Sequence, residues 1–467
     1  MKITGFDDVK RLRTFSLTKR MNHHCECSFS FVSGDFERYK GKLGESVRII
    51  EDDRYLMFGA VFSVEFLQGV SEHIITVTVC PVSVRYDEEK KTRVFQKQDQ
   101  SYKQIVDLVA KELGAQVSVS KEAGEKAAPG PVVQLAETDF AFLVRLAEEG
   151  FHTALAAAAS EEGFACSIGG DDEALKELKM EEFYSLRQFW EHGKEGIAFS
   201  VSGNSKGQEL RQYAEIGRRV SWNGKKYQIT DFQVKKKDGV YRFHCIAVCE
   251  GKTDFPRKHL KPAYLFHATV EENKDPEHRG RIRLDFSDDL VEDMTKENRM
   301  WFDVWTPYLA NNGGFVFIPD VRDDVEAFWD GYQFYIVGSR RRKALEERYR
   351  NVDLKQIGDL HQKNICFSKE ALELSAKDTK AVLKDDSILL TVPNSEITVT
   401  KDEISVTAKS SKIRINDDVI LDSEKVHIDA KEKEDKIGNN YICESRNITL
   451  NASLKTVIQG KAGVSIN

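Results

Sequence analysis

The sequence lacks several features that would each point to a familiar class of protein. No apolar run approaches the roughly 18 residues that a membrane-spanning helix needs. Residues 1–8, MKITGFDD, contain no apolar stretch of the kind that a secretory signal peptide carries. The 69 Lys and Arg are outnumbered by 76 Asp and Glu, and the net charge of −7 argues against a dedicated nucleic-acid-binding protein. We expect cytoplasmic synthesis, and export only by a route that needs no signal peptide.

The sequence also lacks the short motifs that accompany common enzyme chemistries. We find no phosphate-binding loop, no dinucleotide-binding glycine motif, no His-Glu-x-x-His and no nucleophile elbow. Carboxylates are abundant, but pairs such as Asp323 and Asp324 lie in turn-rich β segments, where they are typical of solvated surface. We therefore predict that the protein is not an enzyme, has no catalytic residues and binds no cofactor.

Cysteine provides no disulfide framework, because its eight copies are scattered along a chain of 467 residues. Cys25 and Cys27 follow two histidines and give the strongest hint of a metal site. However, they alternate with Phe29 and Phe31, so all four side chains belong to one face of a predicted strand. A zinc site needs further ligands at suitable spacing, and none follows nearby. We predict a buried strand face and no metal.

Period-two alternation of apolar and polar side chains dominates the rest, which predicts a mainly β protein with a few helices. One helix is predicted over residues 101–114, with Ser101 as its N-cap and Gly114 as its end. A second is predicted over residues 138–150 and is expected to end at Gly150. Residues 155–160, LAAAAS, have helix propensity inside a β region, and the sequence does not settle their structure.

The C-terminal segment from Ser387 onward shows the alternation most clearly. Its apolar pairs are separated by turn residues, so we predict about nine or ten strands of five to seven residues. One apolar face per short strand is too little for a core within a single chain. We expect this face to be buried against copies of itself, through Ile388, Leu390, Val392, Ile397, Val399, Ile404, Val406, Ile413, Ile415, Val419, Leu421, Val426, Ile428, Ile448 and Leu450.

Several segments resemble a known family. Residues 267–270 and 275–286 resemble the first strands of its OB-fold, residues 301–308 and 313–328 resemble its Trp- and Gly-Gly-containing signature, and residues 331–339 resemble the strand that completes it. Upstream, residues 43–62, 93–105 and 134–150 are similar to its barrel and helix segments. These segments follow one another in the same order as in the family. The chain therefore resembles the VgrG-type spikes of type VI secretion systems and the hub-and-needle proteins of contractile phage tails.

The resemblance implies an architecture for the whole chain. It implies a hub β-barrel domain over residues 1–95, helices plus a second hub β-barrel domain over 96–262, an OB-fold over 263–340, a connector over 341–386 and a needle over 387–467. The needle would be a triple-stranded β-helix, or prism, formed by a homotrimer and about 50 Å long. Its end, Val464, Ile466 and Asn467, would dock a PAAR-like tip protein.

The resemblance also implies a function. A trimeric spike would link the tube and baseplate of a contractile injection system to a membrane-puncturing needle and deliver effectors. Its partners would be a tube protein of the Hcp type, a PAAR-like tip, baseplate proteins, secreted effectors and, on injection, the target membrane. The machine would carry it out of the cytoplasm without a signal peptide. A structural baseplate hub or tail-spike protein of a phage or tailocin is the alternative, and a tailspike depolymerase is a weaker one, because it would need a longer β domain and a carboxylate cleft.

Overall fold

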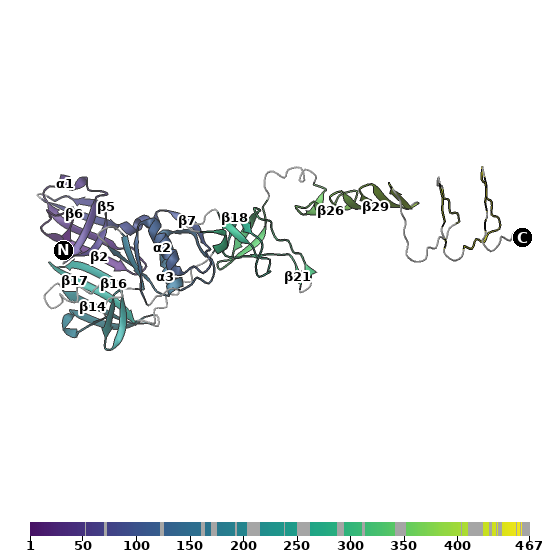
Figure 1. Ribbon diagram of the computed structural model, residues 1–467. Helices are drawn as coiled ribbons and strands as arrows, with labels where there is room; N and C mark the ends of the chain where they lie inside the picture. The colour runs from purple at the N-terminus through teal and green to yellow at the C-terminus, as the bar shows by residue number, and fades with distance from the viewer. Residues whose placement is uncertain are drawn as a thin grey trace. The chain divides into compact units, whose positions relative to one another are not determined.

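The computed structural model divides the chain into two units, Met1–Leu345 and Glu346–Asn467 (Figure 1). The part that the structure describes is residues 1–409 without 52, 70–71, 122–125, 160–163, 170–174, 192–193, 203–214, 238, 250–261, 287–293, 311–312, 341–351 and 403, together with 424–428, 432–435, 437, 441–453, 455–457 and 459. Among these residues no helix combines the length and the apolar character that crossing a membrane would require.

A large antiparallel sheet forms the N-terminal part of the first unit. Its strands lie in the order β1-β4-β5-β6-β3-β2-β16-β17-β14-β13, and β15 and β12 extend it beside β16. The strands are β1 (Lys2–Ile3), β2 (Leu12–Arg20), β3 (Glu26–Ser33), β4 (Ser46–Glu51), β5 (Arg54–Leu67), β6 (His73–Pro81), β12 (Lys176–Glu177), β13 (Ser185–Glu191), β14 (Lys194–Ser202), β15 (Arg219–Trp222), β16 (Lys225–Lys237) and β17 (Val240–Cys249). The short helices α1 (Glu37–Lys40), η1 (Val82–Asp87) and η2 (Met180–Glu182) lie in its connections.

The two predicted hub domains share this sheet. β2 pairs with β16 from Phe15 to Arg20, which joins strands about 215 positions apart in the sequence. One hydrophobic core contains residues of both halves, among them Phe29, Ile75, Phe199 and Tyr227. The halves are therefore parts of one folded body, a link that local sequence patterns do not reveal.

A layer of helices and short strands follows. It contains β7 (Lys90–Phe95), α2 (Tyr102–Leu113), β8 (Gln116–Val119), β9 (Val132–Thr138), α3 (Asp139–Phe151), β10 (Leu155–Ala159) and β11 (Phe164–Ile168). The predicted first helix is confirmed, because Ser101 and Gln104 form a capping box and Gly114 adopts the left-handed conformation that ends it. Buried Arg93 of β7 pairs with Asp139 at 2.7 Å, which fixes α3 to the strand.

The predicted end of the second helix is wrong. α3 continues to Phe151, and His152 takes the left-handed position instead of Gly150. Gly150 lies within the helix. The position requires glycine because a Cβ there would come 2.6 Å from the ring of Tyr102 in α2. The glycine permits two helices to approach each other, which is a packing role that resembles a stop signal in sequence.

The alanine-rich stretch is a strand despite its helix propensity. β10 pairs antiparallel with β11 through all five of its residues. Leu155, Ala156 and Ala157 are buried. Pairing and burial outweigh a local preference of well under 1 kcal/mol per residue.

An OB-type sheet completes the first unit, with the order β19-β18-β23-β24-β20. Its elements are β18 (Tyr264–Glu272), β19 (Arg283–Phe286), η4 (Lys296–Asn298), β20 (Asp303–Val304), the hairpin of β21 (Leu309–Ala310) and β22 (Gly313–Gly314), β23 (Asp324–Trp329) and β24 (Phe334–Ser339). Val94 of β7 and Val133 of β9 belong to its hydrophobic core. Gln96 also donates a hydrogen bond to the Leu284 carbonyl, so the helical layer and the OB domain are packed together.

The second unit contains a seven-stranded antiparallel meander in which each strand pairs with the next along the chain. Its strands are β25 (Lys355–Gly358), β26 (Lys363–Phe367), β27 (Leu372–Ala376), β28 (Thr379–Leu383), β29 (Ser387–Val392), β30 (Ser395–Thr400) and β31 (Ile404–Ala408). The first four strands lie in the stretch 341–386, which the sequence analysis assigned to a connector. Positions 341–351 of that stretch lie outside the described residues.

The strands predicted further along are not found in the single chain. Residues 424–428 and 441–453 are described and belong to no strand or helix, although they contain Val426, Ile428, Ile448 and Leu450. A strand requires a hydrogen-bonded neighbour, and within the described residues the chain supplies none there. This part of the strand prediction is corrected for the isolated chain.

Candidate functional site, the apolar face of the C-terminal sheet

The register of the meander places apolar side chains in continuous rows on one face of the sheet. Directly paired residues point to the same side, so the pairings define each row. One row is Ile357, Ile365, Leu374, Ala381, Leu390, Ile397 and Val406. The neighbouring row is Lys355, Phe367, Leu372, Leu383, Ile388, Val399 and Ile404. Together they form what we call the apolar face, which crosses all seven strands.

Tight turns keep these rows in register. Two-residue connections join β27 to β28 and β29 to β30, and their residues Lys377 and Asn394 have φ of 54° and 65°. Tight turns often need one residue with positive φ, and Asn tolerates this conformation better than most residues. Because a slip of one residue would turn every apolar side chain to the other side, the turns determine the face as well as the pairing.

The apolar face is open to solvent in the single chain. Its large side chains Ile357, Ile365, Phe367, Leu374, Leu383, Ile388, Leu390, Ile397, Ile404 and Val406 are 38% to 72% exposed. Large contiguous apolar patches are rare on the surfaces of monomeric soluble proteins and mark interaction sites. The face therefore has the character of an interface.

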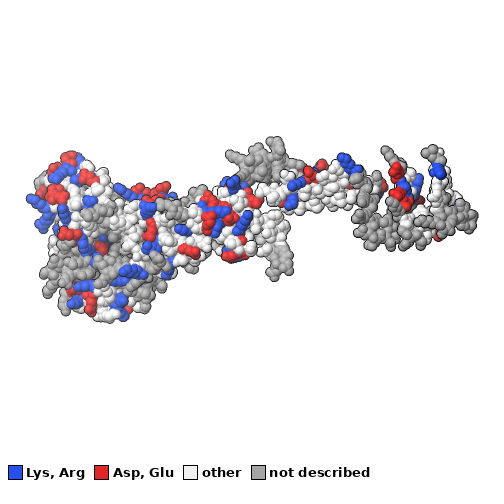
Figure 2. All heavy atoms as spheres, in the orientation of Figure 1, with Lys and Arg blue, Asp and Glu red and all other residues white. Residues whose placement is uncertain are grey.

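The opposite face of the same sheet is mostly polar. Its rows contain Gln356, Glu373, Lys380, Thr391, Glu396, Thr398 and Ser405, with Cys366, Val382 and Leu389 between them. Lys380 and Glu373 form an ion pair of 3.2 Å there. On the side visible in Figure 2, charged side chains lie along one margin of this sheet and uncharged atoms cover the rest. The sheet thus has one side suited to water and one suited to burial.

The predicted interface residues fall into three groups. Ile388, Leu390, Ile397, Val399, Ile404 and Val406 lie on the apolar face, and Val392 lies on the same side at the end of β29. Val426, Ile428, Ile448 and Leu450 are exposed and lie outside any strand. The remainder lie outside the described residues: Ile413, Ile415, Val419, Leu421 and the tip residues Val464, Ile466 and Asn467.

Sequence reasoning missed the part of the apolar face that β25 to β28 contribute. The signal was present, since Ile365 and Phe367, and likewise Leu372 and Leu374, are spaced by two and flanked by turn residues. Shorter strands with charged residues between them concealed the repeat. The repetitive sheet consequently begins at Lys355, upstream of Ser387.

A second exposed apolar surface belongs to the OB domain. Trp305 and Tyr308, on one side of the β21–β22 hairpin, and Phe315 and Phe317, on the other, are all about half exposed or more. The rings of Phe315 and Phe317 are stacked 6.2 Å apart. This surface also has the composition of an interface rather than of a monomer surface.

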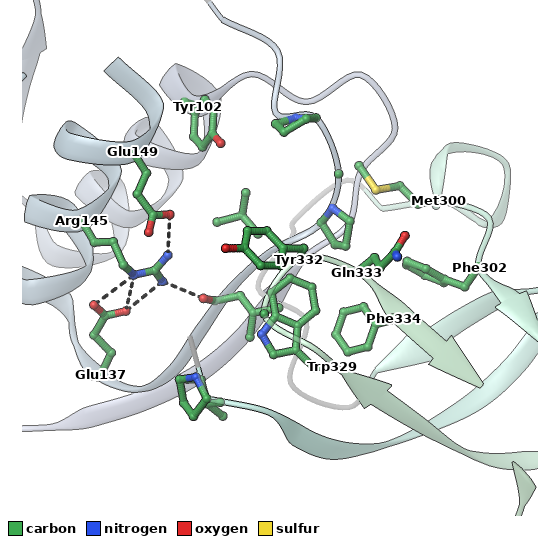
Figure 3. A pocket seen from close by; sticks show the side chains of 18 of the residues that line it. Tyr102, Glu137, Arg145, Glu149, Met300, Phe302, Trp329, Tyr332, Gln333 and Phe334 are labelled. Atoms are coloured by element: carbon green, nitrogen blue, oxygen red, sulfur yellow. Dashed lines mark hydrogen bonds and ion pairs between the residues drawn. The ribbon is translucent and has the colours of Figure 1, made fainter. Parts of the chain in front are cut away.

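A pocket of about 1030 Å³ lies between the helical layer and the OB domain (Figure 3). Arg145 points into it and is held by Glu137 at 2.9 Å, by Glu149 at 3.3 Å and by the Val133 carbonyl at 2.7 Å. Arg281, which also lines it, binds Asp275 at 2.8 Å. Both guanidinium groups are therefore neutralised by the protein itself, and aromatic side chains such as Tyr332 line the pocket beside them.

The cysteine cluster is buried, as predicted, and Cys27, Phe29 and Phe31 share one face of β3, whereas Cys25 lies just before this strand. Cys25, Cys27, Phe29 and Phe31 are all less than 9% exposed. Burial raises the pKa of the Cys25 thiol to about 12, so it stays protonated and is a poor metal ligand. Within the described residues no group of three or more His, Cys, Asp or Glu is arranged to hold a metal ion. The absence of catalysis and cofactors stays a prediction.

Comparisons with known proteins agree with this architecture. Residues 266–327 match the sequence model of the type VI secretion system/phage-baseplate injector OB domain. No curated protein matches the chain. A structure of a lidless PdpA-VgrG complex is similar with a TM-score of 0.51 and 8% identity, over 85% of this chain and 94% of that one. The half-lidded Francisella PdpA-VgrG complex gives a TM-score of 0.50 and 8% identity, over 85% and 84%.

A third structure is that of the E. coli c3393 protein, described as a type VI secretion component that is similar to T4 bacteriophage tail proteins. It aligns with a TM-score of 0.49 and 16% identity, over 73% of this chain and 99% of that one. At such identities, structural likeness establishes the fold. The chain therefore contains an OB domain of the type VI secretion and phage-baseplate injector family and has the fold of VgrG-type spike proteins.

Proposed function

We propose that the chain forms a homotrimeric spike at the tip of a contractile injection system. The single observation that carries this proposal is the apolar face of the C-terminal sheet, which runs unbroken over seven strands and is uncovered in one chain. Burying such side chains contributes about 1.5–3 kcal/mol each, so a protein that left them in water would aggregate or associate.

Three sheets around one axis would bury these rows together and leave the polar faces in water. Two sheets packed face to face would also cover them, and the VgrG-type fold favours three. In either arrangement the partner we propose is a copy of the same surface, because two apolar rows of equal length can cover each other. The exposed apolar hairpin of the OB domain supplies a second region that association would cover.

The meander suits a needle that is pushed along its length. Successive strands are spaced about 4.8 Å apart in the hydrogen-bonding direction, so seven strands cover about 30 Å. Each strand is bonded to the next in the same chain. Compression along this direction presses the strands together, and closure into a prism leaves no lateral edges to fray. We infer that contraction of a sheath drives this needle into a target membrane.

The partners and location follow from that role. The hub would sit on a tube protein of the Hcp type within a baseplate, and a PAAR-like protein would cap the needle. Secreted effectors would travel with the spike. The protein would be assembled in the cytoplasm and carried out by the machine. A phage or tailocin baseplate hub is the second candidate. It is favoured because the family model that matches residues 266–327 describes phage-baseplate proteins as well as type VI secretion proteins.

Molar mass in solution tests the proposal. Light scattering at micromolar concentration is expected to give three times the 53.2 kDa mass of the chain. We also expect the trimer to resist SDS at room temperature. A stable monomer would end the spike interpretation, and a dimer would replace the prism with a two-sheet sandwich. Neighbouring genes separate the two candidates, since membrane-complex genes indicate type VI secretion and head genes indicate a phage.

A further inference from the structure

A groove with a positively charged rim opens at one end of the N-terminal sheet. It has a volume of about 590 Å³, within the usual range for ligand sites. Its walls are residues 8–13, the end of β3 at Phe31 to Ser33, and Lys236 with Gly239 of the β16–β17 hairpin. β2 pairs with β16 only from Phe15 onward, so the chain before it separates from β16 and leaves this space.

Four cationic side chains line the groove: Lys10, Arg11, Arg13 and Lys236. Lys236 donates a hydrogen bond of 2.7 Å from Nζ to the Leu12 carbonyl. Burial, together with the positive charge of Arg11, lowers the pKa of Lys236. Like charges are therefore crowded at this place, and a negative ligand would relieve their repulsion.

The groove does not neutralise these charges itself. Within the described residues Lys10, Arg11 and Arg13 have no salt bridge. The carboxylate that lines the wall there, Asp8, is already engaged, because it accepts a hydrogen bond of 2.5 Å from Tyr39 and pairs with Arg38 at 3.2 Å. The cations of the groove are therefore unpaired in the described part of the chain, and the nearby carboxylate of Asp8 is already bonded to other residues. In the other pocket, by contrast, Arg145 and Arg281 both form ion pairs.

The floor of the groove is apolar. Phe31 and Leu12 are buried at its base, and Val32 on its wall is 44% exposed. A ligand that fills it needs both carboxylates for the rim and apolar groups for the floor. An extended protein segment with alternating acidic and apolar side chains supplies both, since its successive side chains point to opposite sides. Inorganic phosphate or a nucleic-acid backbone would use only the charged rim and would leave the apolar floor in water.

We propose that this groove binds an acidic, extended segment of a partner protein, with its carboxylates on Lys10, Arg11, Arg13 and Lys236 and its apolar side chains against Phe31 and Val32. The inference stands on the hub alone and does not depend on trimer formation through the C-terminal sheet.

Fluorescence anisotropy with a labelled Leu-Glu-Leu-Glu-Leu-Glu peptide tests this on the full chain. We expect binding that weakens as salt rises from about 50 to about 200 mM, because ion pairs at the rim are screened. The triple variant Lys10→Glu, Arg11→Glu, Arg13→Glu should lose about tenfold or more in affinity. A Leu-Gln peptide should bind the wild type more weakly by a similar factor.

A matched variant carries the same charge change elsewhere: Lys126→Glu, Lys226→Glu, Lys274→Glu, three exposed lysines outside the groove. It should bind the peptide like the wild type. Lys236→Gln should lower the peptide affinity a few-fold. This substitution removes one positive charge without introducing a negative one. Circular dichroism melting shows whether each variant is folded.

Three results would overturn the proposal. The first is equal peptide affinity in the two triple variants. The second is displacement of the peptide by single-stranded oligothymidine at equal or lower concentration, which would make the groove a polyanion site. The third is a change of molar mass, instead of peptide affinity, in the groove variant, which would assign the groove to contacts between copies of this chain.

Discussion

The two units of the molecule use the same alternating pattern with opposite results. In Met1–Leu345, the apolar sides of the strands form three closed hydrophobic clusters, and residues such as Phe29, Ile197 and Ile336 are fully buried or nearly so. In the described part of the second unit, no side chain is buried at all, although its strands alternate more regularly. The first unit covers its own apolar surface, whereas the described part of the second unit leaves its apolar surface exposed.

This difference shows what alternation determines and what it leaves open. It determines that a segment is a strand and which side chains share a face. It does not determine what covers that face. In the first unit, sheets, two helices and the OB strands pack on one another, and in the described part of the second a meander of short strands leaves its apolar side exposed. Association is the remaining way to remove that surface from water.

The largest expected effect is the loss of assembly when a charge enters the apolar face. Leu390→Asp places a carboxylate in the middle of the face, opposite Ile397 and Ala381. In an assembled prism, three such charges would meet near the axis, at a cost of several kcal/mol each. We expect light scattering to report monomers at concentrations where the wild type gives the mass of the proposed trimer.

Thr398→Asp is the matched control, because Thr398 lies on the polar side of the same sheet and pairs with Leu389 and Ser405. It should assemble like the wild type. If Leu390→Asp assembled equally well, the apolar face would not be an interface, and the contrast between the two units would need another explanation.

The next effect should appear in the first unit and leave assembly unchanged. Phe334 is 2% exposed, and its ring centroid lies 4.7 Å from that of Phe286 and 4.9 Å from that of Trp329. Phe334→Ala is expected to lower the stability of the OB domain by about 3–5 kcal/mol, from lost burial and the resulting cavity. Chemical denaturation measures it, with the more exposed Val337→Ala on the same strand as control. If Phe334→Ala prevented assembly but left the free energy of unfolding unchanged, the view that the first unit is stabilised by its own core and the second by association would be contradicted.

Sequence predicted the elements whose signals are local. α2 was found because Ser101, Gln104 and Gly114 are a capping box and a stop within one segment. The end of α3 was missed because Gly150 serves a contact with Tyr102, nearly fifty positions away. β2 was not predicted, since a bulge between Leu12 and Thr14 breaks its alternation. The Ala-rich β10 depends on its pairing with β11, which overrides propensity.

The apolar face was predicted in part, and the groove was not predicted. Residues from Ile388 onward followed from spacing alone, whereas the contributions of β25 to β28 required the register of the whole meander. The groove unites Lys10, Arg11 and Arg13 with Lys236, which approach only because β2 pairs with β16. No spacing rule links residues that far apart in the chain.

A smaller and pH-dependent effect is expected at Asp275 in the OB domain. Its carboxylate accepts hydrogen bonds from Arg281 and from three backbone N–H groups, and the bond to Arg281 is the main reason that the pKa of Asp275 lies well below its usual range. Asp275→Asn should lower stability by about 1–3 kcal/mol at neutral pH. Because the folded pKa is depressed, this contribution is present above the unfolded pKa of about 3.9 and is lost as pH falls through the folded value.

Denaturation of the wild type and of Asp275→Asn across pH measures this difference directly. The difference between the two stabilities should be constant above about pH 5, begin to shrink near the unfolded pKa of about 3.9 and vanish only as pH falls through the folded value. A difference that is equally large in acid would show that the substitution acts through packing rather than through charge. Asp285→Asn is a suitable control, since the Asp285 side chain is 47% exposed and its carboxylate pairs with Arg299 at 2.7 Å.

The smallest effect is expected on the polar side of the C-terminal sheet. Lys380 pairs with Glu373 across neighbouring strands at 3.2 Å, and the two side chains are 48% and 31% exposed. Exposed pairs of this kind contribute about 0–1 kcal/mol and are weakened by salt. Lys380→Ala should therefore leave the molar mass unchanged and shift stability by no more than about 0.5 kcal/mol, less still at high salt. Because this residue lies only one strand from Leu390, a loss of assembly in Lys380→Ala would mean that both faces are covered, and the sheet would then be an internal layer of the assembly rather than its outer wall.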